Sequence, residues 1–316
     1  MSVRIRATPR PSWTVVVALA ALLGTASTSA PIADAAPSGR PKTVAAVAAE
    51  NEYADVISQI GGRYVAVTAI MSNPGTDPHT FESSARVSRV VSAARLVVQN
   101  GLGYDSFMTR IEQASPSSSR KVIDVQRLLG LPDSTANPHL WYKPTTMPTV
   151  AKAVAKDLTH LQPAHAAYFH RDLQVFDASL APYDRELARI KAAFPHARVA
   201  TTEPVADYML QAAGVDVMTP WTLQADIMNT VDPPPQGVSL QDALLTGKKV
   251  RALVYNEQVT SSVTEAFLTL ARANKIPVVG AYETMPTPGY HYQTWMLAEA
   301  GALYDALAHR TSSPKL

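Results

Sequence analysis

The stretch at residues 43–71, "TVAAVAAENEYADVISQIGGRYVAVTAIM", decides the expected fold. Residues 43–49 form a short apolar run, which is typical of a buried strand. Residues 52–62 repeat apolar positions at helical spacing and end on two glycines, which indicates a helix with a glycine stop. Residues 64–71 are rich in β-branched side chains and predict a second strand. A strand, a helix and a strand in this order favour a parallel sheet with a crossover helix.

The same alternation continues along the chain on both sides of one long helical segment. Further strands are expected at 94–100, 121–126, 197–203, 250–257 and 276–283. Further helices are expected at 83–94, 104–114, 145–161, 204–214, 263–275 and 292–309. The predicted fold class is therefore α/β, with two lobes of parallel sheet flanked by helices and joined by one long rigid helix.

The joining segment, residues 163–194, contains no glycine and repeats its apolar positions at helical intervals. We interpret it as one linking helix between lobes at 37–162 and 195–316. Two helices that meet at Pro182 are the alternative, because an internal proline kinks or breaks a helix. We expect residues 230–239, "TVDPPPQGVS", to form a loop because of their prolines.

The first 36 residues have the three parts of a secretory signal peptide. Three arginines lie within the first ten residues, an apolar run follows at 13–23, and small residues come next. The apolar run is about half the ~20 residues that a membrane-spanning helix needs, so an uncleaved anchor is the weaker alternative. We expect cleavage near Ala30 or Ala36 and a periplasmic or secreted protein.

The composition excludes several classes of protein and site. Hydrophobic residues make up 47% of the 316 residues and charged residues 17%, which is enough apolar material for a substantial core. The chain has no cysteine, so disulfides, thiolate metal sites and a lipid-linked cysteine are not expected. Of the 28 basic and 26 acidic residues, three arginines and one aspartate lie in segment 1–36, so the remainder carries 25 of each. A neutral protein of this kind argues against nucleic acid as a partner.

Two stretches place a histidine in the same stiff frame. His79 in "NPGTDPHTFE" (73–82) and His139 in "NPHLWY" (137–142) each follow a proline directly. Proline restricts its own φ and the residue before it, so such a loop has less entropy left to lose when its imidazole binds a ligand.

Two glutamates, Glu203 and Glu283, end predicted strands of the second lobe, and the two histidines follow predicted strands of the first. In open α/β sheets, ligands bind beyond the carboxyl ends of the strands, so these four side chains converge if the lobes face each other. Imidazole suits zinc and other transition ions, and carboxylates also accept manganese. Two carboxylates neutralise one dication, so the sequence predicts a metal site of His79, His139, Glu203 and Glu283.

Other assignments of these residues are possible. His291 is close in sequence to Glu283 and is a candidate neighbour of the site. His79 and Glu82 form H-x-x-E, a pair that binds zinc in some hydrolases, although no obvious general base accompanies it. A third possibility is a cleft for an organic ligand or metal chelate with walls formed by Trp141, Trp221 and Trp295, for which core packing is the competing role.

Three long stretches resemble the metal-binding subfamily (cluster A-I) of periplasmic solute-binding proteins, the zinc and manganese receptors of bacterial ABC importers. They are "GGRYVAVTAIMSNPGTDPHTFESSARVSRVVSAARLVVQNGLGYDSFM", "NPHLWYKPTTMPTVAKAVAKDL" and "ETMPTPGYHYQTWM", and the resemblance covers about residues 44–310. It implies two α/β lobes joined by a long rigid helix, with the metal in the cleft between them. Matched one by one, the ligands it implies are His79, His139, Glu203 and Glu283; the last departs from the aspartate most common there.

The resemblance implies a receptor without catalytic activity that captures one divalent ion, zinc or manganese, as its transported ligand. The partner it implies is the membrane permease of an ABC importer, and we expect a monomer. The metal stays open between zinc and manganese, because two imidazoles and two carboxylates suit both.

Overall fold

The computed structural model describes residues 43–73, 81–286 and 288–316. The expected signal peptide at 1–36 and the candidate ligand His79 lie outside the described residues. The described residues form one compact unit, which contains both sheets. None of the helices in the described part of the chain is both long and apolar enough to cross a bilayer.

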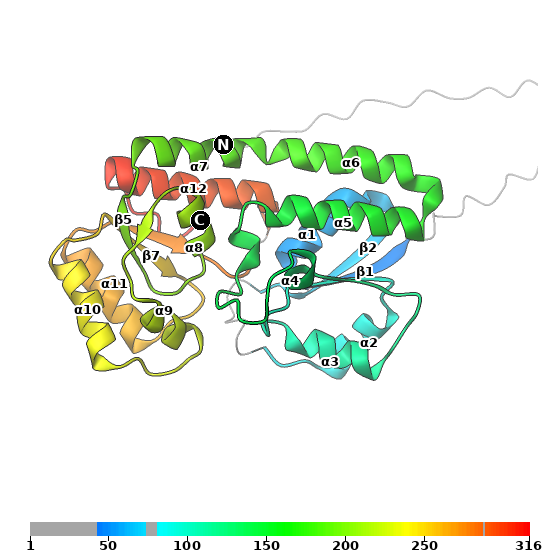
Figure 1. Ribbon diagram of the computed structural model, residues 1–316, viewed down its shortest axis with the longest axis horizontal. Coiled ribbons are helices and arrows are strands. Elements are labelled where there is room, and N and C mark those ends of the chain that lie inside the picture. The colour runs from blue at the N-terminus through cyan, green and yellow to red at the C-terminus, as the bar shows by residue number, and fades with distance from the viewer. Residues whose placement is uncertain (1–42, 74–80, 287) are drawn as a thin grey trace, which may run out of the picture. The chain divides into compact units, whose positions relative to one another are not determined.

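Two four-stranded parallel sheets form the framework of this unit (Figure 1). The first has the order β2-β1-β3-β4 and the second the order β6-β5-β7-β8. Their strands are β1 (Val44–Glu50), β2 (Val65–Met71), β3 (Leu96–Gln99), β4 (Lys121–Asp124), β5 (Arg198–Thr201), β6 (Asp216–Val217), β7 (Ala252–Asn256) and β8 (Val278–Ala281). The predicted fold class, two lobes of parallel sheet flanked by helices, is confirmed; β6 is a strand that the sequence pattern did not predict.

The helices before the linking segment pack on both faces of the first sheet. They are α1 (Asn51–Gly61), α2 (Ala85–Ala93), α3 (Ser106–Ala114), α4 (Val125–Leu128) and α5 (Thr146–Leu161), with short 3₁₀ turns η1 (Gly62–Tyr64) and η3 (Leu140–Tyr142). Val91 of α2 and Phe107 of α3 form a core on one face with Val97 of β3, whereas α1 and α5 cover the other face.

The second sheet is covered in the same way. Its helices are α8 (Asp207–Ala212), α9 (Trp221–Met228), α10 (Pro235–Thr246), α11 (Ser262–Ala273) and α12 (Tyr292–His309). Leu253 of β7 and Phe267 of α11 belong to the core on one face. The other face is covered by α8 and α12. The side chains on this face belong to the largest core, which also includes side chains of the first lobe. Trp141, Phe169 and Leu303 are members of this core.

The linking segment consists of the turn η4 (Pro163–His165) and two consecutive helices, α6 (Ala166–Ser179) and α7 (Ala181–Ala193), which meet at Leu180. Pro182 lies in the first turn of α7, where its missing N–H breaks no intrahelical bond. Helix α6 packs against α1 and α5 of the first lobe, and α7 packs against α12 and α8 of the second (Figure 1).

Two expectations for the second lobe were wrong. Residues 235–239, expected in a loop, are the first residues of α10, because Pro235 occupies the first helical position, where proline is tolerated. The helix expected from residue 204 begins only at Asp207. Pro204 instead lies in the turn after β5, and its carbonyl accepts a hydrogen bond from the side chain of Asn137 at 2.8 Å.

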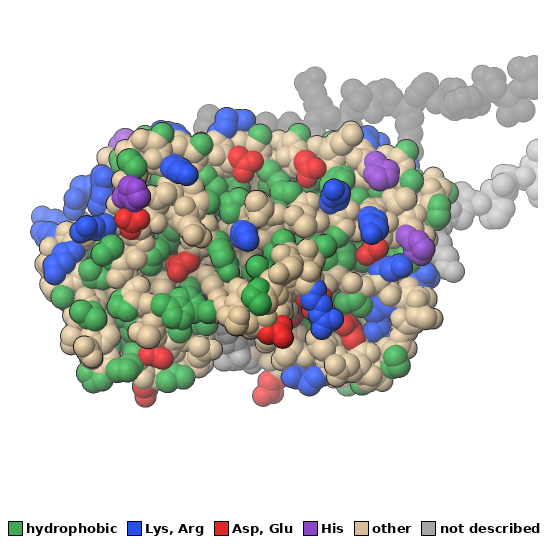
Figure 2. All heavy atoms as spheres, in the orientation of Figure 1, with side chains coloured by type: hydrophobic (Ala, Val, Ile, Leu, Met, Phe, Trp, Pro, Cys, Tyr) green, Lys and Arg blue, Asp and Glu red, His purple; other side chains and the backbone are tan. Residues whose placement is uncertain are grey.

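The face of the molecule in Figure 2 carries charged side chains of both signs. Acidic and basic groups are scattered over it among polar and apolar side chains, and acidic groups lie in both lobes. This distribution agrees with the equal numbers of acidic and basic residues beyond segment 1–36.

Candidate metal centre

His139 lies in the segment between β4 and α5, immediately before the turn η3. Leu140, Trp141 and Tyr142 of that turn are completely buried, so hydrophobic packing anchors the backbone that carries the imidazole. The side chain of His139 is also completely buried. The carbonyl of Pro138, one residue earlier, accepts a hydrogen bond from Nδ2 of Asn100 at 2.9 Å, which ties this segment to the end of β3.

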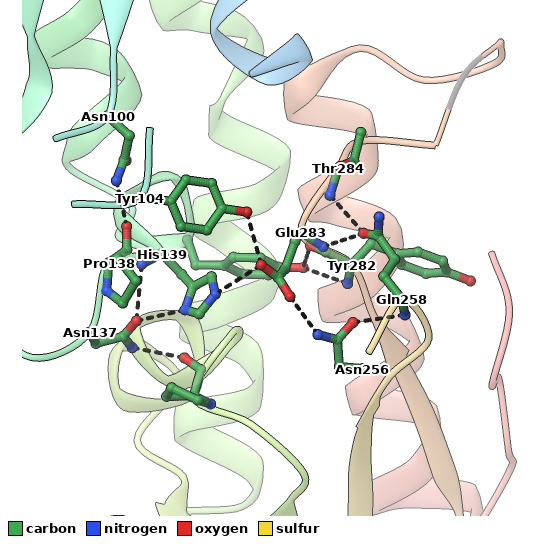
Figure 3. A network of polar contacts seen from close by, with 12 residues as sticks. Asn100, Tyr104, Asn137, Pro138, His139, Asn256, Gln258, Tyr282, Glu283 and Thr284 are labelled. Atoms are coloured by element: carbon green, nitrogen blue, oxygen red, sulfur yellow. Dashed lines mark hydrogen bonds and ion pairs between the residues drawn. The ribbon is translucent and has the colours of Figure 1, made fainter. Parts of the chain in front are cut away.

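Glu283 lies two residues beyond β8, and its carboxylate is held from both lobes (Figure 3). Oε1 accepts a hydrogen bond from Nδ2 of Asn256 at 2.7 Å, and Oε2 accepts one from the hydroxyl of Tyr104 at 2.8 Å. The backbone N–H groups of Glu283 and Thr284 both donate to Oε1 of Gln258. The carboxylate therefore has a defined orientation although it follows the end of a strand.

The structure brings His139 and Glu283 together. Nε2 of the imidazole lies 3.4 Å from Oε2 of the carboxylate, and both side chains have no exposed surface (Figure 3). An imidazole nitrogen and a carboxylate oxygen at this distance, each on a supported backbone, are suited to share a cation.

Glu203 lies two residues beyond β5 and is 3% exposed. The next residue, Pro204, accepts the hydrogen bond from Asn137, which belongs to the His139 segment. The backbone of Glu203 therefore adjoins the same segment as the imidazole, although it belongs to the other lobe.

The other candidates have different positions. His79 lies outside the described residues, and within those residues no group of three or more His, Asp or Glu side chains is arranged to hold a metal ion. Glu82 is exposed and precedes α2. His291 is directed at Asp55, with Nδ1 2.7 Å from its Oδ1, and is largely exposed. Within the described part, His291 thus pairs with an acid other than the candidate ligands.

The three candidate tryptophans divide between core and surface. Trp141 and Trp295 are completely buried, as expected for core residues. Trp221 is 40% exposed, so a core role was a wrong expectation for it. It is the first residue of α9, directly after Pro220, and this position leaves part of the indole at the surface.

Two acidic side chains that sequence reasoning missed are buried at the end of β1. Glu50 and Glu52 are 2% and 0% exposed, and the protein encloses their carboxylate oxygens completely. Burial raises the pKa of both well above the ordinary value, and the charges of Asp105 and Glu52 raise the pKa of Glu50 further. The charge of Glu283 does the same for Glu52. The run "AENE" (49–52) after an apolar strand was the available signal.

A second buried network supports the ligand segments. The hydroxyl of Tyr142 lies 2.7 Å from Oε2 of Glu299, 2.8 Å from the carbonyl of Tyr282 and 3.1 Å from the N–H of Tyr282. Nε1 of Trp295 donates to Oε1 of Glu299 at 2.7 Å. Burial raises the pKa of Glu299 to about 8, although the hydrogen bonds from Tyr142 and Trp295 lower it. Tyr142 and Tyr282 are close in sequence to His139 and Glu283, so this network holds the two ligand segments at a defined separation.

Residues 46–306 match the protein family described as ZnuA, zinc-uptake complex component A, periplasmic. The chain belongs to this family. It is 24% identical to the iron-binding protein YfeA of Yersinia pestis over 221 residues, which are 67% of this chain and 68% of that protein. It is also 24% identical to the manganese ABC transporter substrate-binding lipoprotein PsaA of Streptococcus anginosus over 247 residues, 73% of this chain and 77% of that protein.

The fold of this ZnuA-family chain is that of solved relatives. The structure of the periplasmic zinc binding protein TroA from Treponema pallidum superposes with a TM-score of 0.71 at 20% identity, covering 85% of this chain and 99% of that one. The resemblance noted in the sequence is thereby confirmed. Membership of a family of metal-uptake components favours a metal receptor over a hydrolase or a receptor for an organic solute.

Proposed function

We propose that this ZnuA-family protein is an extracytoplasmic receptor that captures one divalent transition metal ion between its two sheets and delivers it to an ABC permease. The ion is its cargo, and its role is binding rather than catalysis. The observation that carries the proposal is the buried pair of His139 and Glu283, one from each lobe, 3.4 Å apart.

We assign the ligands as His79, His139, Glu203 and Glu283. Support comes from the burial of Glu203 beside the His139 segment and from the bonds that Tyr104 and Asn256 donate to Glu283. Such outer hydrogen bonds orient metal ligands and tune their basicity. His79 shares with His139 a position directly after a proline.

The electrostatic surroundings favour a cation. Glu50, Glu52 and Asp105 are buried acids near this pair, and burial raises the pKa of Asp105 to about 6. The charge of Glu52 raises the pKa of Glu50, and the charge of Glu283 raises the pKa of Glu52, which reflects like charges within interaction range. A dication bound by His139 and Glu283 would offset this repulsion, because buried charges are costly unless they are paired or coordinate a metal.

The choice of ion follows from the ligand types and from relatives. Nitrogen and oxygen ligands suit zinc, manganese and iron(II), whose intrinsic affinities rise from manganese to zinc. Relatives are named for iron and manganese, and a structural neighbour for zinc. We propose zinc or manganese as cargo and include iron(II) among the ions to test.

The proposal places the protein outside the cytoplasm after removal of segment 1–36, with residues 37–162 and 195–316 as the two metal-binding lobes. The family description, a periplasmic component of an uptake complex, supports this location and a membrane permease as partner. We propose that the receptor is a monomer and does not bind nucleic acid, for which a basic surface would be needed.

The test is native mass spectrometry of the metal-stripped protein titrated with zinc, manganese and iron(II). We expect one tightly held ion in the wild type and its loss in His139→Ala and Glu283→Ala. His170→Ala serves as the matched control, because His170 is exposed on α6. Unchanged stoichiometry and affinity in both ligand variants would place the site elsewhere.

A parallel assay addresses hydrolysis. The zinc-loaded protein is incubated with peptide and ester substrates, with Glu82→Gln as the comparison. Saturable turnover that Glu82→Gln abolishes would contradict a role in binding alone.

A further inference from the structure

We propose that Asn137 is a positioning residue that forces His139 to present Nε2 to the metal and couples this imidazole to the Glu203 segment of the other lobe. This inference rests on the proposed function. It concerns a side chain that is 8% exposed and makes three hydrogen bonds with two segments (Figure 3).

Two backbone groups define the orientation of the Asn137 amide. The backbone N–H of His139, which can only donate, lies 3.0 Å from one atom of the amide, so that atom is the oxygen Oδ1. The carbonyl of Pro204, which can only accept, lies 2.8 Å from the other atom, so that atom is the nitrogen Nδ2. Reversing the amide would replace both hydrogen bonds by repulsive contacts.

The tautomer of His139 follows from this orientation. Nδ1 of the imidazole lies 2.8 Å from Oδ1 of Asn137. An amide oxygen has no proton to donate, so Nδ1 must carry the proton in this contact. The neutral imidazole then has its lone pair on Nε2, the atom that faces Glu283. Asn137 thus selects the nitrogen that coordinates the ion.

The second half of the amide connects the lobes. Nδ2 donates to Pro204, directly after Glu203, and the hydroxyl of Tyr208 donates to the carbonyl of Asn137 at 3.0 Å. A displacement of the Glu203 segment would therefore be transmitted to the residue that holds the imidazole. Asn137 therefore fixes the positions of His139 and Glu203 relative to each other, in addition to any ion that they share.

The variant Asn137→Asp separates the two roles. An aspartate would still accept from Nδ1 and from the backbone N–H of His139, but its carboxylate has no donor for the Pro204 carbonyl. Asn137→Asp should therefore keep coordination through Nε2 and lose the connection to the other lobe. Asn137→Ala should lose both.

The experiment uses the full-length mature protein and zinc alone as the probe. Two-bond ¹H–¹⁵N spectra of the zinc-loaded protein report which ring nitrogen of His139 carries the metal, and competition with a chromogenic chelator reports affinity. Asn274→Ala is the matched control, because its amide also donates to a backbone carbonyl, that of Leu270 on α11. Circular dichroism monitors folding.

We expect Nε2 coordination in the wild type and in Asn137→Asp, with affinity reduced ~10-fold or more in the latter. Asn137→Ala should show a reduction of ~10- to 100-fold and a second signal from Nδ1 coordination, as for other residues that orient metal ligands. If Asn137→Ala does not fold, Asn137→Asp decides through its affinity.

Two results would overturn the inference alone: zinc on Nδ1 of His139 in the wild type, or variants of Asn137 that bind zinc like the Asn274→Ala control. A wild type that binds no zinc, manganese or iron(II) would overturn the proposed function and the inference together.

Discussion

The side-chain amide of Asn51 hydrogen-bonds the backbone of Met285 in both directions. Nδ2 donates to the carbonyl at 2.8 Å, and Oδ1 accepts from the N–H at 3.0 Å. Asn51 opens α1 at the end of β1, and Met285 lies two residues beyond Glu283. The two lobes are therefore joined beside the candidate metal centre by a pair of buried hydrogen bonds.

Asn51→Ala should destabilise the metal-free protein. The variant leaves the buried N–H and carbonyl of Met285 without their partner, which should lower the free energy of unfolding by about 2–4 kcal/mol. Urea denaturation measures this change. Asn229→Ala is the control, since Asn229 is exposed and should change stability by less than about 1 kcal/mol. Equal stability of the two variants would show that the Asn51 contact contributes little.

Glu283→Gln should separate metal binding from folding. A glutamine can still accept from Asn256 with its oxygen, and its NH₂ group can donate to the hydroxyl of Tyr104, so the local network persists. The variant lacks the negative charge that a dication requires, and we expect zinc affinity to fall by ~100-fold or more. Isothermal titration calorimetry measures the affinity, and a thermal melt of the metal-free variant checks the fold. Wild-type affinity would exclude Glu283 as a ligand.

Metal should raise the melting temperature of the wild type. An ion that binds only the folded state stabilises it by about 2.7 kcal/mol at a concentration 100 times its Kd, which corresponds to about 3–10 °C for a chain of this size. Differential scanning fluorimetry with and without zinc, followed by a chelator, measures this shift. His139→Ala should show no shift, whereas His170→Ala should behave as the wild type.

Glu299→Gln should change how stability depends on pH. The pKa of Glu299 is raised from 4.5 to about 8, so the folded protein holds this proton in a range where the unfolded chain has lost it. Stability therefore falls as pH rises through this window, and neutral glutamine removes that loss. Between about pH 5 and about pH 8, the variant should lose less stability than the wild type, by on the order of 1–4 kcal/mol.

Urea denaturation at the two pH values tests this expectation. Glu265→Gln is the control, because Glu265 is exposed on α11. A pH dependence of Glu299→Gln that equals that of the wild type would mean that Glu299 is ionised in the folded protein at neutral pH.

Local patterns were sufficient for most elements of the fold. The helix expected at 292–309 is α12 with the same bounds, and the strand expected at 64–71 is β2, one residue shorter. These segments have strong periodicity because one or both faces are buried along their whole length. The pattern failed at β6 and α9, which have two and eight residues, and at α10, which was not expected as a helix and whose prolines indicated a loop. Short elements offer too few residues for a period to be recognised.

The candidate site was predicted only in part. His139 and Glu283 were identified from a proline frame and a strand end, and the structure places them in contact. Glu50, Glu52 and Asn137 were missed, because an acid near a strand end or an amide in a loop has no distinctive local pattern when its partners lie far away in sequence.

The sequence by itself determined the α/β class, the two repeated strand–helix series and the residue types available to a cation, because these depend on composition and on short-range periodicity. Only the tertiary structure decided which side chains meet. Parallel sheets with the same strand order, β2-β1-β3-β4 and β6-β5-β7-β8, bring the residues that follow their strands together across the two lobes. Because unpaired polar groups are costly when buried, burial at that point decides which partners His139 and Glu283 have.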